Sequence, residues 1–135
     1  MSYLKIIFVI LILFPMTIYS QNTLTIQIGG LQNNKGKVLL VLLDKNENMI
    51  KEFYGDIREN KCIVKIEDIK PGKYSFKYFH DENNNKKLDT NYFGIPTEGF
   101  GFSNNVKGTF GPPSFEKTIF DLKGERSLKC TPKYY

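Results

Sequence analysis

Apolar and polar residues alternate along much of this chain, with the period of two that is typical of β-strands. Residues 24–28 and 62–66 alternate cleanly, which predicts strands that bury one face and expose the other. Residues 73–80 predict a further strand that is rich in aromatic side chains. Residues 37–43 are instead a continuous apolar run of strand length, which predicts a strand that is covered on both faces.

Residues typical of turns separate these segments. Asparagine and glycine at residues 33–36 predict a hairpin turn between the first two strands, and a polar turn follows at residues 44–48. Residues 69–72 contain proline, which presets φ, and then glycine, which accepts positive φ, so they predict another turn. Residues 49–54 form a weaker segment, which is either a strand or a short irregular stretch.

Two more strands are predicted further along, at about residues 114–122 and 127–133. About seven short strands with turns every 8–12 residues predict an all-β fold, a single Greek-key β-sandwich of the immunoglobulin-like or prealbumin-like type. Residues 81–113 are rich in Asn, Gly, Pro and Phe and are too long for an ordinary connection. We therefore expect one long, ordered and functional loop in this region.

The first twenty residues have the features of a signal peptide. Lys5 precedes an apolar run at residues 6–14, and the small residue Ser20 follows it. The run is short for a transmembrane helix, which needs about 20 apolar residues, although an uncleaved anchor is the alternative. We expect a signal peptide at residues 1–20, one domain over residues 21–135, and a periplasmic or extracellular location.

The charge of the chain changes this picture little. The formal net charge is +5, and lysines are interspersed with acidic residues without a run of five like charges. The sequence therefore does not favour a nucleic-acid partner, and it does not predict an oligomeric state.

The two cysteines, Cys62 and Cys130, are in phase with apolar neighbours, so both side chains are expected to point inward. Outside the cytoplasm a disulfide between them would persist. Their spacing does not show whether the two Cα atoms lie within about 7 Å of each other. A disulfide and two small core residues are therefore both open interpretations.

Candidate chemistry begins at residue 81, where oxygen-bearing side chains fall at alternate positions. A calcium loop uses side chains at positions 1, 3, 5 and 9 and a backbone carbonyl at position 7, which correspond here to Asp81, Asn83, Asn85, Asp89 and Lys87. A tightly wound loop directs these oxygens to one point, as a cation with six to eight ligands requires. The alternative is a turn whose Asn and Asp side chains bond their own backbone.

Two positions depart from the calcium-loop pattern. Lys86 is at position 6, where glycine usually makes the sharp turn, and Tyr92 is at position 12, where an acidic residue usually closes the shell. Glu98 or Glu82 is the candidate replacement for that acidic residue.

The segment that follows combines glycine and proline, which fix the path of the chain, with phenylalanine, which supplies apolar contact. Its candidate binding residues are Phe93, Glu98, Phe100, Phe102 and Phe110. Either the aromatic side chains pin an ordered loop onto the sandwich, or some of them line an exposed recognition surface.

His80, the single histidine, stands beside Asp81. The sequence has no nucleophile elbow, paired histidine ligands or Cys–His signature, so no catalytic residue is assigned. The enzymatic alternative is a metal-assisted hydrolase with a site around His80, Asp81, Asp89 and Glu98.

Four runs carry a resemblance to a known family: IKPGKY at residues 69–74, FHDENNNKKLD at 79–89, FGIPTEGFGFSNN at 93–105 and FGPPSF at 110–115. Together they resemble the exported bacterial proteins grouped as domain-of-unknown-function family 2141. The family pattern more often has glycine where this chain has Lys86. The resemblance implies an exported sandwich similar to transthyretin-like or carboxypeptidase regulatory-like domains, and it implies no activity.

Taken together, these features favour a non-enzymatic binding or accessory module of the cell envelope. A rigid scaffold commonly presents its functional residues on long loops, so residues 81–115 are the expected contact region for an envelope or extracellular ligand. Calcium is the one cofactor that the sequence suggests.

Overall fold

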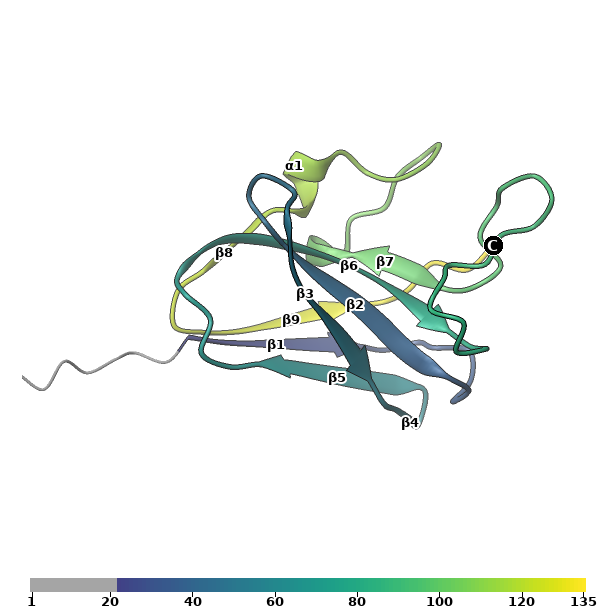
Figure 1. Cartoon of the computed structure of the whole chain (residues 1–135), viewed down its shortest axis with the longest axis horizontal. Helices are drawn as coiled ribbons and strands as arrows, with labels where there is room; N and C mark the ends of the chain where they lie inside the picture. The colour runs from purple at the N-terminus through teal and green to yellow at the C-terminus, as the bar shows by residue number, and fades with distance from the viewer. Residues whose placement is uncertain (1–21) are drawn as a thin grey trace, which may run out of the picture.

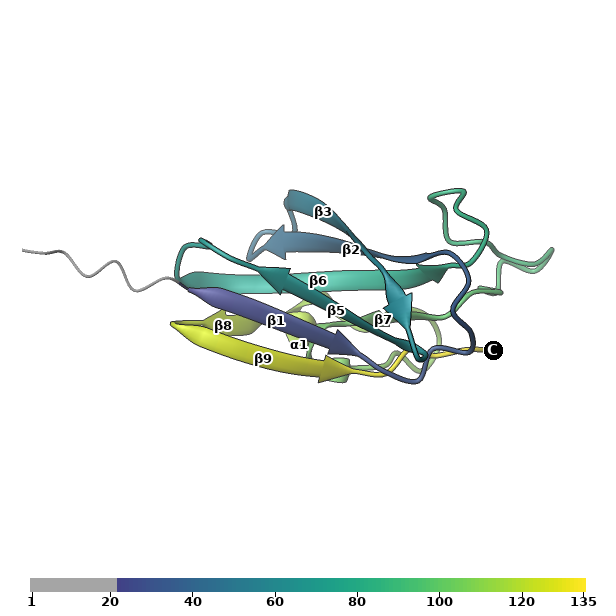
Figure 2. The ribbon, with the colours of Figure 1, turned by 90° about the horizontal axis from the view of Figure 1, so that it is seen from below.

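The computed structural model describes residues 22–135, and the predicted signal peptide at residues 1–20 lies outside them. Two β-sheets pack face to face as a sandwich (Figures 1 and 2), which confirms the predicted all-β fold class. No helix within residues 22–135 is long and apolar enough to cross a membrane.

The first sheet has the strand order β4-β5-β1-β9. Its strands are β1 (Thr23–Ile28), β4 (Ile57–Arg58), β5 (Lys61–Ile66) and β9 (Glu125–Cys130). β1 pairs antiparallel with β5 and parallel with β9, so the first and last strands of the described chain are neighbours. Burial alternates strictly along β1 and β5, as their sequence pattern predicts.

The second sheet has the order β3-β2-β6-β7, and β8 also pairs with β6. Its strands are β2 (Lys37–Asp44), β3 (Met49–Gly55), β6 (Gly72–Asp81), β7 (Phe100–Phe102) and β8 (Phe120–Leu122). The weak segment at residues 49–54 is therefore a strand. The short strands β4 and β7 were not predicted, because two or three residues carry too little alternation to recognise.

The core lies between the inner faces of the two sheets. Its largest fully buried apolar side chains are Phe76, Leu24, Ile26, Ile28, Leu40, Leu42 and Leu122. β2 is also covered on its outer face, where Leu39 and Leu43 are each only 6% exposed. This confirms the expected cover of both faces at these positions, whereas the outward Val41 between them is only half-buried.

The turn at residues 33–36 is not a hairpin, and this prediction was wrong. β1 belongs to the first sheet and β2 to the second, so the chain crosses between sheets at this turn. The turn at residues 69–72 likewise links β5 to β6 in the other sheet. Turn residues show where the chain reverses, whereas the partner of each strand is decided by packing between distant segments.

The strand predicted at about residues 114–122 is only partly present. The structure has a short helix, α1 (Phe115–Thr118), before β8. The Thr118 hydroxyl donates to the Phe115 carbonyl within this turn and bonds Ser75 Oγ at 2.7 Å in the interior. This buried polar contact holds the helical turn, and no local sequence pattern reveals it. The last strand also lies earlier than predicted, since β9 ends at Cys130.

Cys62 and Cys130 are both buried, as expected, and both are free thiols. Ile28 pairs with Cys62 on one side and with Cys130 on the other, so the two cysteines are two strands apart. At about 4.8 Å between neighbouring strands, their Cα atoms are separated by roughly 10 Å, which exceeds the reach of a disulfide. In this structure the cysteines are therefore two small core residues.

Candidate functional site

The long connection between β6 and β7 projects from the end of the sandwich opposite to the start of β1 (Figure 1). Residues 81–98, which make up nearly all of this connection, are called the oxygen-rich loop. A second connection, between β7 and α1, includes the short 3₁₀ turn η1 (Ser103–Asn105) and carries Phe110. Together they make up the region from residue 81 to residue 115 that the sequence singled out.

The oxygen-rich loop brings together the side chains predicted to bind calcium. The Asp81 carboxylate is buried, and its two oxygens accept the backbone N–H groups of Asn85 and Lys86 at 3.1 and 2.9 Å. The side-chain amides of Asn83 and Asn85 donate to the two carboxylate oxygens of Asp89 at 2.6 and 2.7 Å. Four of the predicted residues thus meet within one wound segment of chain.

Lys86 adopts the left-handed conformation that calcium loops usually assign to glycine, with φ of 62°. A non-glycine residue pays about 1 to 2 kcal/mol for this conformation. The charge-assisted bond from the Lys86 N–H to Asp81 offsets part of that cost. The sharp turn is therefore present although glycine is not. Lys87 was predicted to contribute its backbone carbonyl, and the bond that the structure shows is made instead by its N–H, which donates to Asn85 Oδ1 at 2.9 Å.

Glu98 closes the base of the oxygen-rich loop. Its side chain is buried, and its carboxylate accepts the backbone N–H groups of Glu82 and Asp89 at 3.0 and 3.1 Å. Burial raises the pKa of Glu98 above its usual range, although the two N–H donors act in the opposite direction. Glu98, a candidate replacement for the missing acidic residue at position 12, therefore directs its two carboxylate oxygens at backbone N–H groups.

The hydrogen bonds of the oxygen-rich loop have two implications. Its carboxylates accept N–H groups of the loop itself, which is what a turn that satisfies its own backbone requires. Its oxygen-bearing side chains also lie close together, which is a first requirement for a hard cation, although Asn83 and Asn85 direct Nδ2 rather than Oδ1 at Asp89. Among residues 22–135, no three His, Cys, Asp or Glu side chains form a group suited to a metal ion, so amide and carbonyl oxygens would have to complete any cation shell.

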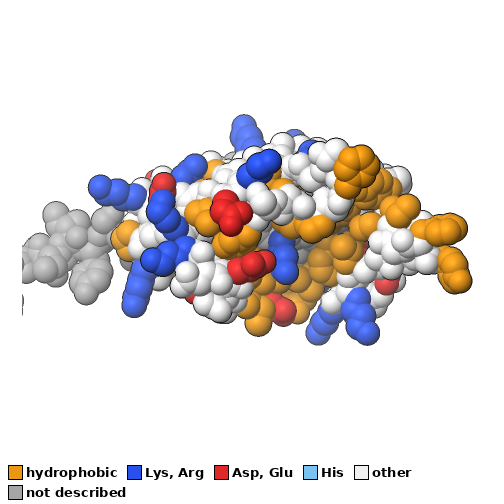
Figure 3. Space-filling model, turned by 90° about the horizontal axis from the view of Figure 1, so that it is seen from above, with side chains coloured by type: hydrophobic (Ala, Val, Ile, Leu, Met, Phe, Trp, Pro, Cys, Tyr) orange, Lys and Arg blue, Asp and Glu red, His pale blue; other side chains and the backbone are white. Residues whose placement is uncertain are grey.

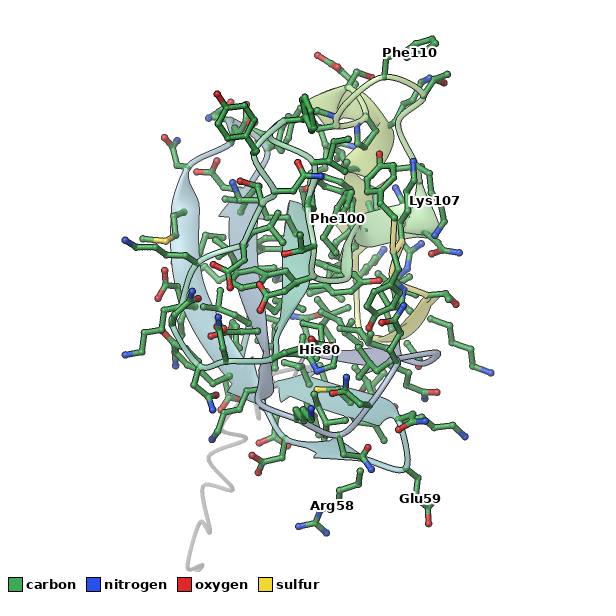
Figure 4. The ribbon with its side chains drawn as sticks, turned by 90° about the vertical axis from the view of Figure 1, so that its right-hand side faces the viewer. Arg58, Glu59, His80, Phe100, Lys107 and Phe110 are labelled. Carbon is green, nitrogen blue, oxygen red and sulfur yellow. The ribbon has the colours of Figure 1, made fainter. Side chains whose placement is uncertain are left out.

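His80 is fully buried, and both of its ring nitrogens are engaged. Nε2 donates to the Lys35 carbonyl at 2.7 Å, since a carbonyl can only accept, and Nδ1 accepts from the Tyr134 hydroxyl at 3.0 Å. The Tyr134 oxygen in turn accepts the Gln32 N–H. Figure 4 shows His80 inside the body of the molecule. His80 therefore ties the C-terminal segment and the β1–β2 connection to β6.

The five candidate binding residues separate into three groups. Glu98 is buried and supports the loop, as described above. Phe100 and Phe102 are half-buried neighbours on β7, with ring centroids 6.3 Å apart. Phe93 and Phe110 are exposed on separate loops, and Figure 4 shows Phe110 at the periphery of the molecule. The sequence thus grouped residues with different structural roles.

The most exposed part of the oxygen-rich loop is a tight turn that carries Tyr92 and Phe93. These side chains are 98% and 82% exposed and pack edge to face, with ring centroids 5.7 Å apart. The turn is held by Asn91, whose Oδ1 accepts the N–H groups of Phe93 and Ile95 at 2.9 and 3.1 Å. Sequence reasoning missed Tyr92, although an asparagine followed three residues later by glycine signals such a turn.

Comparison with known proteins confirms the family that the sequence resembles. A family model described as an uncharacterized protein conserved in bacteria matches residues 26–129. The chain belongs to the DUF2141 family. The matched span reaches from β1 into β9 and includes the whole 81–115 region, so the candidate site is part of the family domain. No curated protein and no solved structure matches the chain.

Proposed function

We propose that this DUF2141 protein is a non-enzymatic binding module of the bacterial cell envelope. The sandwich is the scaffold, and residues 81–115 are the contact region. The observation that carries the proposal is the exposure of Tyr92 and Phe93 on a turn that hydrogen bonds hold in one conformation. Large apolar side chains fixed in contact with water are typical of interaction sites, because a partner removes their apolar surface from water without having to order them.

The groups considered for hydrolysis have structural roles instead. Both nitrogens of His80 are engaged in the interior. The carboxylates of Asp81 and Glu98 accept backbone N–H groups of the oxygen-rich loop, and the carboxylate of Asp89 accepts two side-chain amides of the same loop. A general base must reach a substrate proton directly or through one water, and these four side chains are directed at the protein itself. The geometry therefore favours binding over catalysis.

Cosedimentation with a washed envelope fraction of the source bacterium tests the binding role. We expect the protein to bind, and the double variant Tyr92→Ser, Phe93→Ser to bind about tenfold more weakly, which corresponds to roughly 1.4 kcal/mol of lost contact energy. The matched control is Ile63→Ser, which changes an exposed apolar side chain on β5 in the other sheet. Equal binding of the double variant and the wild type would contradict the proposed contact region.

We further propose that calcium stabilises the oxygen-rich loop. The supporting observations are the convergence of Asp81, Asn83, Asn85 and Asp89 and the left-handed winding at Lys86. Binding would require the two asparagine amides to rotate, because their Nδ2 groups now face Asp89. A rotated amide would present oxygen next to the Asp89 carboxylate and would give up the N–H group of Asn85 or Lys87 that its Oδ1 now accepts.

Thermal unfolding with excess calcium and then with chelator tests this part of the proposal. Calcium at 100 times its dissociation constant stabilises a native state by about 2.7 kcal/mol, which raises the midpoint by several degrees. Asp81→Asn should remove the calcium-dependent rise, whereas Asp56→Asn, at an exposed carboxylate between β3 and β4, should keep it. If the wild type shows no rise, the loop is a turn that satisfies itself without an ion.

A further inference from the structure

The outer face of the second sheet is unusually apolar for an antiparallel sheet. Such sheets commonly turn a polar face to water. Here β2 and β6 place Leu39, Val41 and Phe79 on that face, and the last two are only partly covered. Hydrophobic side chains gather in a hollow over this sheet in Figure 3. The apolar run of β2 is thus only partly explained by the fold.

The hollow is an apolar groove of about 250 Å³. Strands β2, β6 and β7 supply its base, and Leu88 contributes from the oxygen-rich loop. Phe100 and Phe102 line it on β7, next to Phe79 and Lys77 of β6. Phe100 and Phe102, two of the predicted binding residues, therefore line this groove. The groove is separate from the exposed turn that carries Tyr92.

Lys77 is the one charged residue that lines the groove. In register it lies between Val41 on β2 and Phe102 on β7, so apolar side chains flank its stem. Within residues 22–135 its ammonium group has no hydrogen-bond or ion-pair partner. Glu52, which is also in register with Val41, is engaged with the Tyr54 hydroxyl. The groove thus combines an apolar base with a single cationic group that no acid neutralises.

We propose that the groove binds a free fatty acid or a similar single-chain carboxylate. The hydrocarbon chain would lie on the apolar base, and the carboxylate would pair with the Lys77 ammonium group. A groove of this size suits one small ligand better than a protein segment, and it lies on the face of the sheet, away from the open strand edges that bind extended peptides. This inference rests on the binding role proposed above and names its ligand class, and it does not depend on calcium.

Calorimetric titration of protein purified from cells that express the full chain tests the ligand class. The probes are decanoate, decanol and decyltrimethylammonium, which share a chain length and differ in charge, each below its micelle concentration. We expect one decanoate per chain and affinities at least about tenfold weaker for the other two. Equal affinities for all three probes, or no decanoate binding, would overturn the proposal.

Variants locate the binding site. Lys77→Gln should weaken decanoate about tenfold and leave decanol unchanged, whereas the control Lys65→Gln, on the other sheet, should change neither. Val41→Phe should fill the groove and weaken all binding. If Val41→Phe does not fold, Leu88→Glu, in the exposed loop, supplies the same test. Unchanged decanoate affinity in Lys77→Gln would refute the proposed pairing.

The result of the decanoate titration can be distinguished from the results of the calcium and envelope-binding experiments. Titration of decanoate in the presence of chelator removes any effect of calcium. Decanoate binding should persist there, because strands β2, β6 and β7 supply most of the groove. The double variant at Tyr92 and Phe93 leaves the groove intact, since neither side chain lines it. Loss of envelope binding with retained decanoate binding would therefore place the two activities at different parts of the region.

Discussion

The outer faces of the two sheets differ in how much apolar surface they expose to water. On the first sheet, β5 alternates strictly, and its outward Ile63 is 65% exposed, beside Lys61 and Lys65. On the second sheet, the outward Leu39 of β2 is 6% exposed. The outer face of β5 is therefore open to water, whereas on the second sheet the outward Leu39 is covered and Val41 and Phe79 are partly covered. The oxygen-rich loop and the groove both belong to the second sheet, whose outer face is the more covered.

The largest expected effect tests whether the two sheets share one core. Phe76 is fully buried and packs edge to face on Phe120, with ring centroids 5.8 Å apart. Phe76→Ala should lower the free energy of unfolding by about 3–5 kcal/mol, through lost burial and the cavity that remains. Urea unfolding measures this loss. A loss below about 1 kcal/mol would show that the inner faces are not packed against each other as described.

The outer faces can be compared directly with a matched pair of substitutions. Leu39→Ala removes a buried side chain and should cost about 2–3 kcal/mol. Ile63→Ala removes an exposed one and should change stability by less than about 0.5 kcal/mol. Both are read as urea midpoints at one pH. Similar costs at the two positions would remove the contrast between the faces.

The strands could be read from the sequence, whereas their arrangement could not. Alternation is local, so β1, β5 and β6 were predicted nearly to the residue. The pairing of β1 with β9 joins segments about a hundred residues apart, and no local pattern encodes it. The helical turn α1 depends on the contact between Thr118 and Ser75, which are 43 residues apart in the sequence and likewise beyond any local pattern.

In the candidate site, too, the local contacts followed from the sequence and the long-range arrangement did not. The sequence left two interpretations of residues 81–89 open, a calcium loop and a turn that satisfies its own backbone. The oxygen-bearing side chains Asp81, Asn83, Asn85 and Asp89 do lie together, because the bonds among them span few residues. The groove was not predicted, since it needs β2, β6 and β7 side by side. Its sequence signal was the continuous apolar run of β2, which showed that the outer face needs cover without showing what supplies it.

A smaller effect concerns Glu98, which closes the base of the oxygen-rich loop. Burial raises the pKa of Glu98 in the folded state above its unfolded value. Its contribution to stability is therefore fully present below the unfolded pKa and is lost as pH rises through the folded pKa. Urea midpoints of the wild type and Glu98→Gln, measured from pH 4 to pH 8, should show the wild-type advantage shrinking as pH rises. A constant difference across this range would contradict the assigned pKa direction.

The smallest expected effect concerns the thiols at the first sheet. Cys62 and Cys130 are not bridged, so a reducing agent should leave the melting midpoint unchanged. Burial, with a further contribution from Asp56, raises the pKa of Cys62 to about 11, which keeps this thiol protonated and unreactive at neutral pH. A thiol reagent should therefore label both cysteines only after unfolding. A midpoint that falls on reduction would indicate a disulfide.

The parallel pairing of β1 with β9 has a consequence for how the molecule is made. During synthesis β1 emerges from the ribosome early, and it can pair with β5 after about forty more residues. Its other edge stays open until β9 has emerged, and the hydroxyl of Tyr134 reaches His80 only afterwards. Domains with such long-range pairings fold slowly and expose apolar surface meanwhile. Much of the chain must therefore wait, incompletely folded, for its final strand, which is the interval in which a chaperone would recognise it.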